Sequence, residues 1–243
     1  MKILSIAANR YHKELQEINL ELATLPEGSL SMKRNSYYQI INRKQICITK
    51  NPPLIKMLRR KIYLLVRKKQ IEHNLKAESV GELDMRLPQE LIASLSKPYS
   101  KAPITHFYHP KTVKWLKKLH PTNTLHPERA VYTYKDINFR LLAERIIAEE
   151  IDHLQLIYQY DVRLTLAERQ ISPDFIIINP YNHETYILEH YGLGEKNYIN
   201  NMNDKMDFYL TSQIVPFENL MSTYEYHIRK PERIRNLIEK TIF

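Results

Sequence analysis

The chain has 243 residues, 43% of them hydrophobic, so it is long enough to bury a core. Its formal net charge of +9 favours a polyanionic partner, with nucleic acid ranked before an anionic membrane surface. Its single cysteine, Cys47, excludes an internal disulfide and thiolate-rich zinc or iron–sulfur sites, and it suits a reducing, cytoplasmic compartment. The four glycines are too few to form a Walker loop or a dinucleotide-binding motif. No segment approaches the roughly 20 consecutive apolar residues that a membrane-spanning helix needs.

Residues 4–25 carry apolar side chains at alternating spacings of three and four, which predicts a helix with one apolar face. Pro26 and Gly28 should end this helix. The apolar positions are Leu4, Ala8, Tyr11, Leu15, Ile18, Leu22 and Leu25. The face either packs within its own domain or forms a short coiled coil that makes a homodimer, and three heptads do not decide between the two.

From Gly28 the apolar pattern has a period of two, which predicts a meander of strands at 29–33, 37–41 and 45–49, followed by a helix at 54–75. We interpret 1–77 as a basic N-terminal module. Between Lys33 and Lys69 the chain has twelve lysines and arginines and no acidic residue. Such uncompensated charge indicates contact with a nucleic-acid backbone, although a solvated basic face has the same pattern. The candidate contacts are Lys33, Arg34, Arg43, Lys44, Arg59, Arg60, Arg67 and Lys68.

Residues 78–130 are weakly periodic and rich in proline, which predicts a connecting region with short helices, one of them near 111–119. Four histidines in this segment are too loosely spaced to indicate a zinc site, and no cysteine or acid lies among them. They are His106, His109, His120 and His126.

The charge balance then inverts, because 141–189 holds nine acidic residues against three arginines, and this places a second domain at 131–243. Helical spacing predicts a helix at 136–156, with Glu144 at the edge of its buried face. A helix packed on the following strands could aim this carboxylate at them. A strand is expected at 157–165.

The stretch 171–192 is the most informative part of the chain, because two β-branched apolar runs flank six turn-forming residues at 179–184. A hairpin folded about the centre of that turn pairs Asp174 with Glu189 on one sheet face. Two carboxylates about 5 Å apart repel each other, and a bridging Mg²⁺ relieves the repulsion because hard cations prefer carboxylate oxygens. The pair therefore predicts a metal site, unless both acids are solvated residues at strand ends.

Downstream, a helix is expected at 197–210 and a strand at 219–224. A strand, helix and strand with this spacing form a crossover, so the last strand should run parallel to 185–190. Lys205 shares one flank of the helix with Tyr209. Pro231 should open a closing helix.

This order of elements and motifs resembles the PD-(D/E)xK nuclease superfamily over about 136–242. The matching motifs are Ser172-Pro173-Asp174-Phe175 and Leu188-Glu189-His190-Tyr191-Gly192, which look like the branch with a Glu-His-x-Gly motif. The basic front half is similar to a group of bacterial proteins that join a small β-rich module to such a domain. The resemblance implies a restriction-endonuclease-like α/β (α+β) fold, with a mixed sheet flanked by helices.

The resemblance further implies a metal-dependent endonuclease, a hydrolase of phosphodiester bonds acting on DNA. Asp174 and Glu189 would hold Mg²⁺ or Mn²⁺, and Glu144 would complete the metal site directly or through water. Tyr191 stands where the superfamily has a lysine, so the resemblance assigns that role to Lys205 on the next helix, with Lys196 as second candidate.

Two other interpretations remain open. The first is a non-catalytic DNA-binding protein with a degraded nuclease-like domain. The second is a peripheral membrane protein that uses its basic face, which is disfavoured because the chain lacks an amphipathic helix with both a basic and a bulky apolar face.

Overall fold

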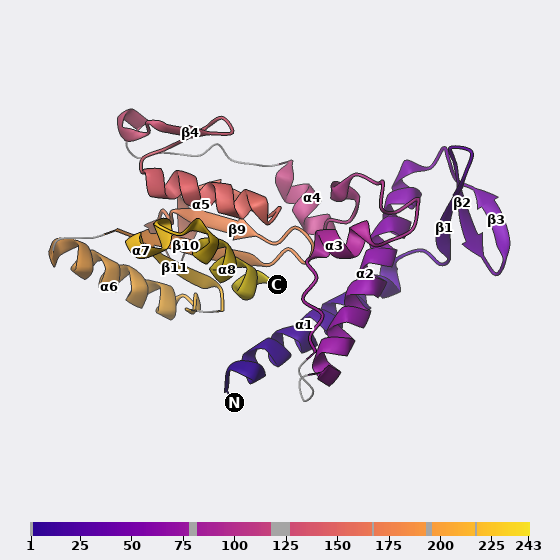
Figure 1. The fold of residues 1–243 in the computed structure, drawn as a ribbon, viewed down its shortest axis with the longest axis horizontal. Coiled ribbons are helices and arrows are strands. Elements are labelled where there is room, and N and C mark those ends of the chain that lie inside the picture. The colour runs from indigo at the N-terminus through magenta and orange to yellow at the C-terminus, as the bar shows by residue number, and fades with distance from the viewer. Residues whose placement is uncertain (1, 78–81, 118–126, 167, 193–195, 217) are drawn as a thin grey trace. The chain divides into compact units, whose positions relative to one another are not determined.

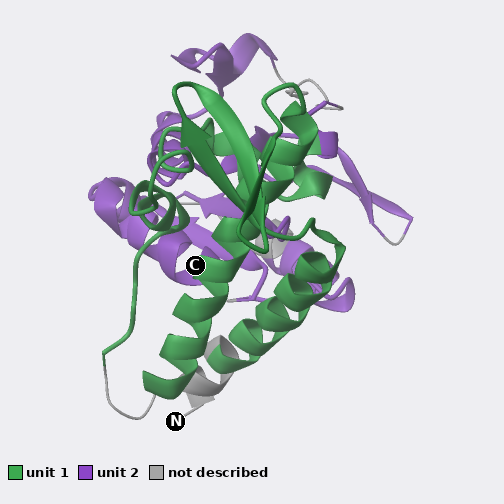
Figure 2. Cartoon of the chain, turned by 90° about the vertical axis from the view of Figure 1, so that its right-hand side faces the viewer, with its two compact units in different colours: residues 1–113 green, residues 114–243 purple. Residues whose placement is uncertain are grey.

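The computed structural model describes residues 2–77, 82–117, 127–166, 168–192, 196–216 and 218–243, and omits the side chains of 2–7 and 196–202. The chain forms two compact units, 1–113 and 114–243 (Figures 1 and 2). The segment 78–130, expected to connect two domains, is thus divided between the units. Among the helices described, none combines the length and apolarity needed to cross a bilayer.

The first unit begins with a helix, a three-stranded antiparallel meander and a second helix, as the sequence predicts (Figure 1). The elements are α1 (Lys2–Thr24), β1 (Ser29–Lys33), β2 (Ser36–Ile41), β3 (Lys44–Cys47) and α2 (Pro52–Ala77). Both residues of the turns Arg34-Asn35 and Asn42-Arg43 have positive φ, the conformation of tight hairpin turns. Helix α1 packs against α2 and buries Ile18, so its apolar face contacts its own domain.

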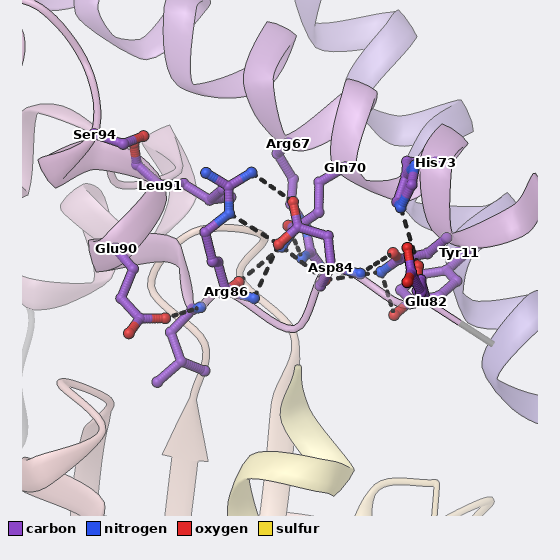
Figure 3. Close-up of polar contacts among 12 residues, drawn as sticks. Tyr11, Arg67, Gln70, His73, Glu82, Asp84, Arg86, Glu90, Leu91 and Ser94 are labelled. Carbon is purple, nitrogen blue, oxygen red and sulfur yellow. Dashed lines mark hydrogen bonds and ion pairs between the residues drawn. The ribbon is translucent and has the colours of Figure 1, made fainter. Parts of the chain in front are cut away.

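Two buried amide side chains of α2, Asn74 and Gln70 (the latter labelled in Figure 3), hydrogen-bond to the backbone of the segment after that helix. Asn74 Nδ2 donates to the Asp84 carbonyl at 3.1 Å, and Asn74 Oδ1 accepts the Asp84 N–H at 2.7 Å. Gln70 Nε2 donates to the carbonyls of Asp84 and Arg86. The amides thereby satisfy backbone groups that have no strand partner there. The short helices α3 (Pro88–Ala93), η1 (Ile104–His106) and α4 (Pro110–Leu116) follow.

The second unit is built on a four-stranded mixed sheet of order β11-β10-β9-β6. Strands β10 and β11 are parallel and the other pairs are antiparallel, as expected for the hairpin and the crossover. The elements are η2 (Pro127–Arg129), β4 (Tyr132–Tyr134), β5 (Ile137–Phe139), α5 (Leu142–His153), β6 (Ile157–Tyr160), β7 (Leu164–Leu166), β8 (Arg169–Ile171), β9 (Phe175–Ile178), β10 (Thr185–Tyr191), α6 (Lys196–Thr211), β11 (Leu220–Tyr224), α7 (Glu225–Ile228) and α8 (Pro231–Ile242).

Helices cover both faces of this sheet (Figure 1). One face carries the row Tyr160, Phe175 and Leu188, and its aromatic rings pack with Phe139 beside α5. On the other face Ile187 packs with Tyr209 of α6. The α/β architecture with a mixed sheet between helices is therefore present in this unit.

Two predicted elements were wrong in extent. The helix expected at 136–156 begins at Leu142, because Lys135 and Asp136 have positive φ and form the turn between β4 and β5. The strand expected at 157–165 ends at Tyr160, since Asp161 has a φ of 49° and breaks it. Glu144 consequently lies in the first turn of α5 rather than in its middle.

Candidate active site

Asp174 lies directly before β9, and its carboxylate hydrogen-bonds to β10 at the point where the pairing of the two strands ends. The N–H of Ile187 donates to the Asn219 carbonyl beside β11, so alternation along β10 turns the His190 N–H toward β9. There Asp174 Oδ2 accepts it at 2.7 Å. The backbone pairing of β9 with β10 ends at Phe175 and Leu188, one residue before Asp174 and Glu189. The register of this pairing is the one that the sequence predicts.

Glu189 projects from β10 toward α6, where two side chains bind it. Lys205 Nζ lies 2.7 Å from the Glu189 carboxylate, and the Tyr209 hydroxyl donates to Oε1. Positions 205 and 209 are one helical turn apart and share a face of α6. Lys205 also donates to the Ser172 carbonyl at 3.4 Å. The structure therefore brings Lys205 to Glu189, beside the strand end that carries Asp174.

Burial makes Glu189 an unusual acid. Its side chain is 3% exposed. Burial raises the pKa of Glu189 to about 7, and the negative charge of Asp174 adds to the effect against the opposing influence of Lys205. Near neutral pH this carboxyl group is therefore divided between its protonated and ionised forms.

Glu144 reaches the end of the sheet from the opposite face. Its Oε2 accepts hydrogen bonds from the Leu141 N–H and the Tyr160 hydroxyl, each at 2.8 Å. Burial raises the pKa of Glu144, and the charge of Asp174 raises it further. The charge of Asp174 therefore acts on Glu144, and the hydrogen bond from Tyr160 holds the Glu144 carboxylate on the α5 side of the sheet.

Arg140 connects these acids, and the sequence pattern did not reveal it. Its Nη2 lies 3.6 Å from Glu144, 3.7 Å from Asp161 and 4.0 Å from Asp174. Asp161 was also missed, although it directly follows a strand. Arg140 precedes Glu144 by four residues in a segment expected to be helical, which hid its position at the end of β5.

The prediction that Glu144 joins Asp174 and Glu189 as a direct ligand of one ion is not supported, and its alternative, a contact through water, stays a prediction. Within the described ranges no group of three or more His, Cys, Asp or Glu side chains is placed to hold a metal. The site is instead the pair Asp174 and Glu189, with Glu144 linked to it through Arg140.

The donor set nevertheless fits a divalent cation. Four acids, Glu144, Asp161, Asp174 and Glu189, meet two cations, Arg140 and Lys205, so full ionisation leaves two uncompensated negative charges. Mg²⁺ is commonly held by one or two carboxylates and keeps several waters. Asp174 and Glu189 are the pair that suits this mode of binding.

His190 and Tyr191 take other positions. His190 points away from Glu189, as strand alternation predicts, and its Nδ1 lies 3.1 Å from Thr223 Oγ1. Tyr191, at the position where the resemblance expects lysine, is 5% exposed. Lys196 begins α6, and its side chain lies outside the described residues.

The basic candidates of the first unit divide into two groups, and the buried group contradicts the prediction of a surface contact. Arg60 donates two hydrogen bonds to Glu21, and Arg67 donates two to Glu14. Both arginines are buried between α2 and α1. Their charge is compensated by the acids of α1, outside the basic run.

Arg59 is also buried, so the prediction is wrong for it too, since its guanidinium binds His106, the Tyr37 hydroxyl and the Pro98 carbonyl. Lys68 lies on the flank of α2 and donates to Asn19 Oδ1. The exposed candidates are on the meander: Lys33, Arg34, Arg43 and Lys44.

Comparisons of this chain with protein-family models, curated proteins and solved structures find no match. Its function is therefore inferred from its own residues and contacts.

Proposed function

We propose that the C-terminal unit is a metal-dependent nuclease of the PD-(D/E)xK type that hydrolyses phosphodiester bonds in DNA. The observation that carries this proposal is the Lys205 ammonium 2.7 Å from the Glu189 carboxylate, at the strand end where Asp174 also lies. The parallel crossover from β10 through α6 to β11 supports it, because this topology supplies the lysine from the following helix.

Asp174 and Glu189 would hold Mg²⁺ or Mn²⁺, which when bound acidifies water and neutralises charge on the scissile phosphate. Lys205 places a positive charge beside the acid pair, where it stabilises negative charge that develops on the phosphate oxygens. Tyr209 fixes one oxygen of Glu189. Arg140 places a second positive charge near Glu144 and Asp174.

Cleavage by matched variants tests the proposal. The protein is incubated with plasmid, single-stranded DNA and RNA, with Mg²⁺, Mn²⁺ or EDTA. Asp174→Asn keeps an oxygen acceptor for the His190 N–H but removes the charge, and should lower the cleavage rate at least about a hundredfold. Lys205→Met should lower it by about 10²- to 10³-fold. Asp207→Asn, exposed on the same helix, is the control and should cleave like the wild type. Mg²⁺-dependent cutting that survives in Asp174→Asn would refute the assignment.

Metal binding offers a test that does not depend on turnover. Titration calorimetry should show Mg²⁺ affinity rising as the pH rises through about 7, because Glu189 must lose its proton to bind a cation. The heat should vanish in Asp174→Asn and persist in Asp207→Asn.

A second candidate is a non-catalytic DNA-binding protein. It is favoured by the two protein donors, Lys205 and Tyr209, that already engage the buried Glu189 carboxylate, an arrangement that also suits a structural ion pair. Retention of DNA with no cutting under any metal condition would select this alternative.

A further inference from the structure

Helix α7 begins at the carboxyl end of β11 (Figure 1), and four ring-bearing side chains form a cluster there with the end of β10. The Tyr224 and Tyr226 rings are nearly parallel, at 7°, with centroids 6.1 Å apart. The His227 ring lies 3.9 Å from Tyr226. Tyr191 lies 5.7 Å from Tyr224 on its inner side.

The cluster is fixed in place by backbone contacts. The Tyr224 N–H donates to His227 Nδ1 at 2.9 Å, which ties the imidazole to the first turn of α7. Tyr224 pairs with Tyr191 across the parallel strands, and Tyr191 is buried. The Tyr224 ring therefore packs on a buried neighbour, and Tyr226 lies on a helix rather than on a loop.

The outer rings face solvent. Tyr226 is 55% exposed and Tyr224 is 38% exposed. Exposed basic residues follow at once: Arg229, Lys230 and Arg233. Two acids, Glu225 and Glu232, share this stretch, so cations exceed anions by one over 225–233. Exposed aromatic rings beside positive charge are the combination with which proteins bind single-stranded nucleic acid.

The Tyr191 and Tyr224 rings are on the sheet face of Glu189. Glu189 pairs with Ser222, and Tyr191 pairs with Tyr224 two residues further on, so these side chains share one face. Two residues along a strand cover roughly 7 Å, so the Tyr224 backbone lies about that far along the sheet from Ser222, the neighbour of Glu189.

We propose that Tyr224 and Tyr226 form a stacking platform for unpaired bases, so that this chain binds single-stranded nucleic acid in preference to duplex. Duplex bases stack on one another and present no free face, whereas an unpaired base can lie on an aromatic ring. The consequence for cleavage, selection of single-stranded substrate, rests on the proposed nuclease function. The binding preference stands without it.

Fluorescence anisotropy in EDTA tests the platform. The probes are a single strand of about 12 nucleotides, its duplex, and the same strand with abasic sites in its central half. The wild type should bind the intact strand about tenfold more tightly than the abasic strand, which carries the same phosphates. Tyr226→Ala should lose about tenfold on the intact strand and nothing on the abasic one. Tyr226→Phe, which keeps the ring, should retain wild-type affinity.

Tyr132→Ala is the matched control, because this tyrosine of β4 is 38% exposed, as Tyr224 is, and lies outside the cluster. Equal affinity of the wild type for intact and abasic strands, or no binding of either, would overturn the platform. So would wild-type affinity in Tyr224→Ala and Tyr226→Ala together. Base-dependent binding without cleavage would leave the platform standing and remove the nuclease. Cleavage without base-dependent binding would do the reverse.

Discussion

At the scale of single residues, Glu189 and Asp174 are neighbouring acids with different environments. Asp174 is 18% exposed and accepts a backbone N–H, whereas Glu189 is buried beneath α6. Burial and a like charge both disfavour ionisation of Glu189, and one lysine does not offset them. Acids perturbed in this way occur preferentially at functional sites.

The raised pKa of Glu189 makes stability depend on pH. The folded protein binds this proton more tightly than the unfolded chain, since the pKa is about 7 in place of the ordinary 4.5. The stabilisation is fully present below pH of about 4.5 and is lost as the pH rises to about 7. Relative to Glu189→Gln, the wild type should lose on the order of 3 kcal/mol of unfolding free energy across this window. Urea denaturation at a series of pH values, without divalent cations, measures it.

The control for this experiment is Asp207→Asn, which removes an exposed acid from the same helix. Its stability curve should run parallel to that of the wild type. A parallel curve for Glu189→Gln would instead show that Glu189 is ionised throughout the window.

At the scale of elements, the arginines of α2 show that neighbouring residues in the sequence do not reveal the ion-pair partners of a charged side chain. Arg60 and Arg67 are seven residues apart, and so are Glu14 and Glu21 on the antiparallel α1, so two bidentate pairs form between the helices. Within the basic run there is no acid, and the compensating charges come from about forty to fifty residues away in sequence.

The Arg60–Glu21 pair should behave as a buried ion pair. Arg60→Met leaves Glu21 without its bidentate donor and should cost about 3 kcal/mol of unfolding free energy. The double variant Arg60→Met with Glu21→Leu should recover most of that loss, because no unpaired charge remains. Urea denaturation of the two single variants and the double variant forms the cycle. Additive losses would show that the two side chains do not interact.

Replacement of Asn74 tests how strongly the segment that follows α2 is held to that helix (Figure 3). Asn74→Ala removes both the donor and the acceptor that bind the Asp84 backbone, and should cost about 1–3 kcal/mol. Hydrogen exchange of the Asp84 amide should accelerate accordingly. Lys69→Ala, exposed on the same helix, should leave that exchange nearly unchanged.

The sequence predicts the elements better than their junctions. The register of β9 with β10 follows from the turn at 179–184, and the parallel crossover follows from the order of strand, helix and strand. The breaks at Asp136 and Asp161 were missed because both are non-glycine residues with positive φ, a conformation that residue type predicts weakly. The partners of Glu144 were missed for the same reason, since its position depends on where α5 begins.

At the scale of the whole molecule, the run of twelve lysines and arginines between Lys33 and Lys69 overstates the basic surface of the first unit. Three of its eight candidate nucleic-acid-binding residues are buried and donate hydrogen bonds to groups within the unit. The four exposed candidates gather on one small sheet, with Arg34 and Arg43 at its two turns, and Lys68 is partly buried on α2. Binding of phosphates by this unit is therefore expected at the meander rather than along α2.

The salt dependence of DNA binding tests whether the exposed arginines of the meander, and not the buried arginines of α2, neutralise phosphates. Arg34→Asn with Arg43→Asn removes two exposed charges, and asparagine tolerates the positive φ of these turns, so the sheet should remain folded. The slope of log affinity against log salt for single-stranded DNA should become shallower by about 0.7 for each phosphate that the protein no longer neutralises. The Arg60→Met, Glu21→Leu double variant alters charges only in the interior and should keep the wild-type slope. A slope unchanged by the turn variants would place the phosphate-binding residues elsewhere on the chain, and the exposed cations beside Tyr226 would be the next to replace.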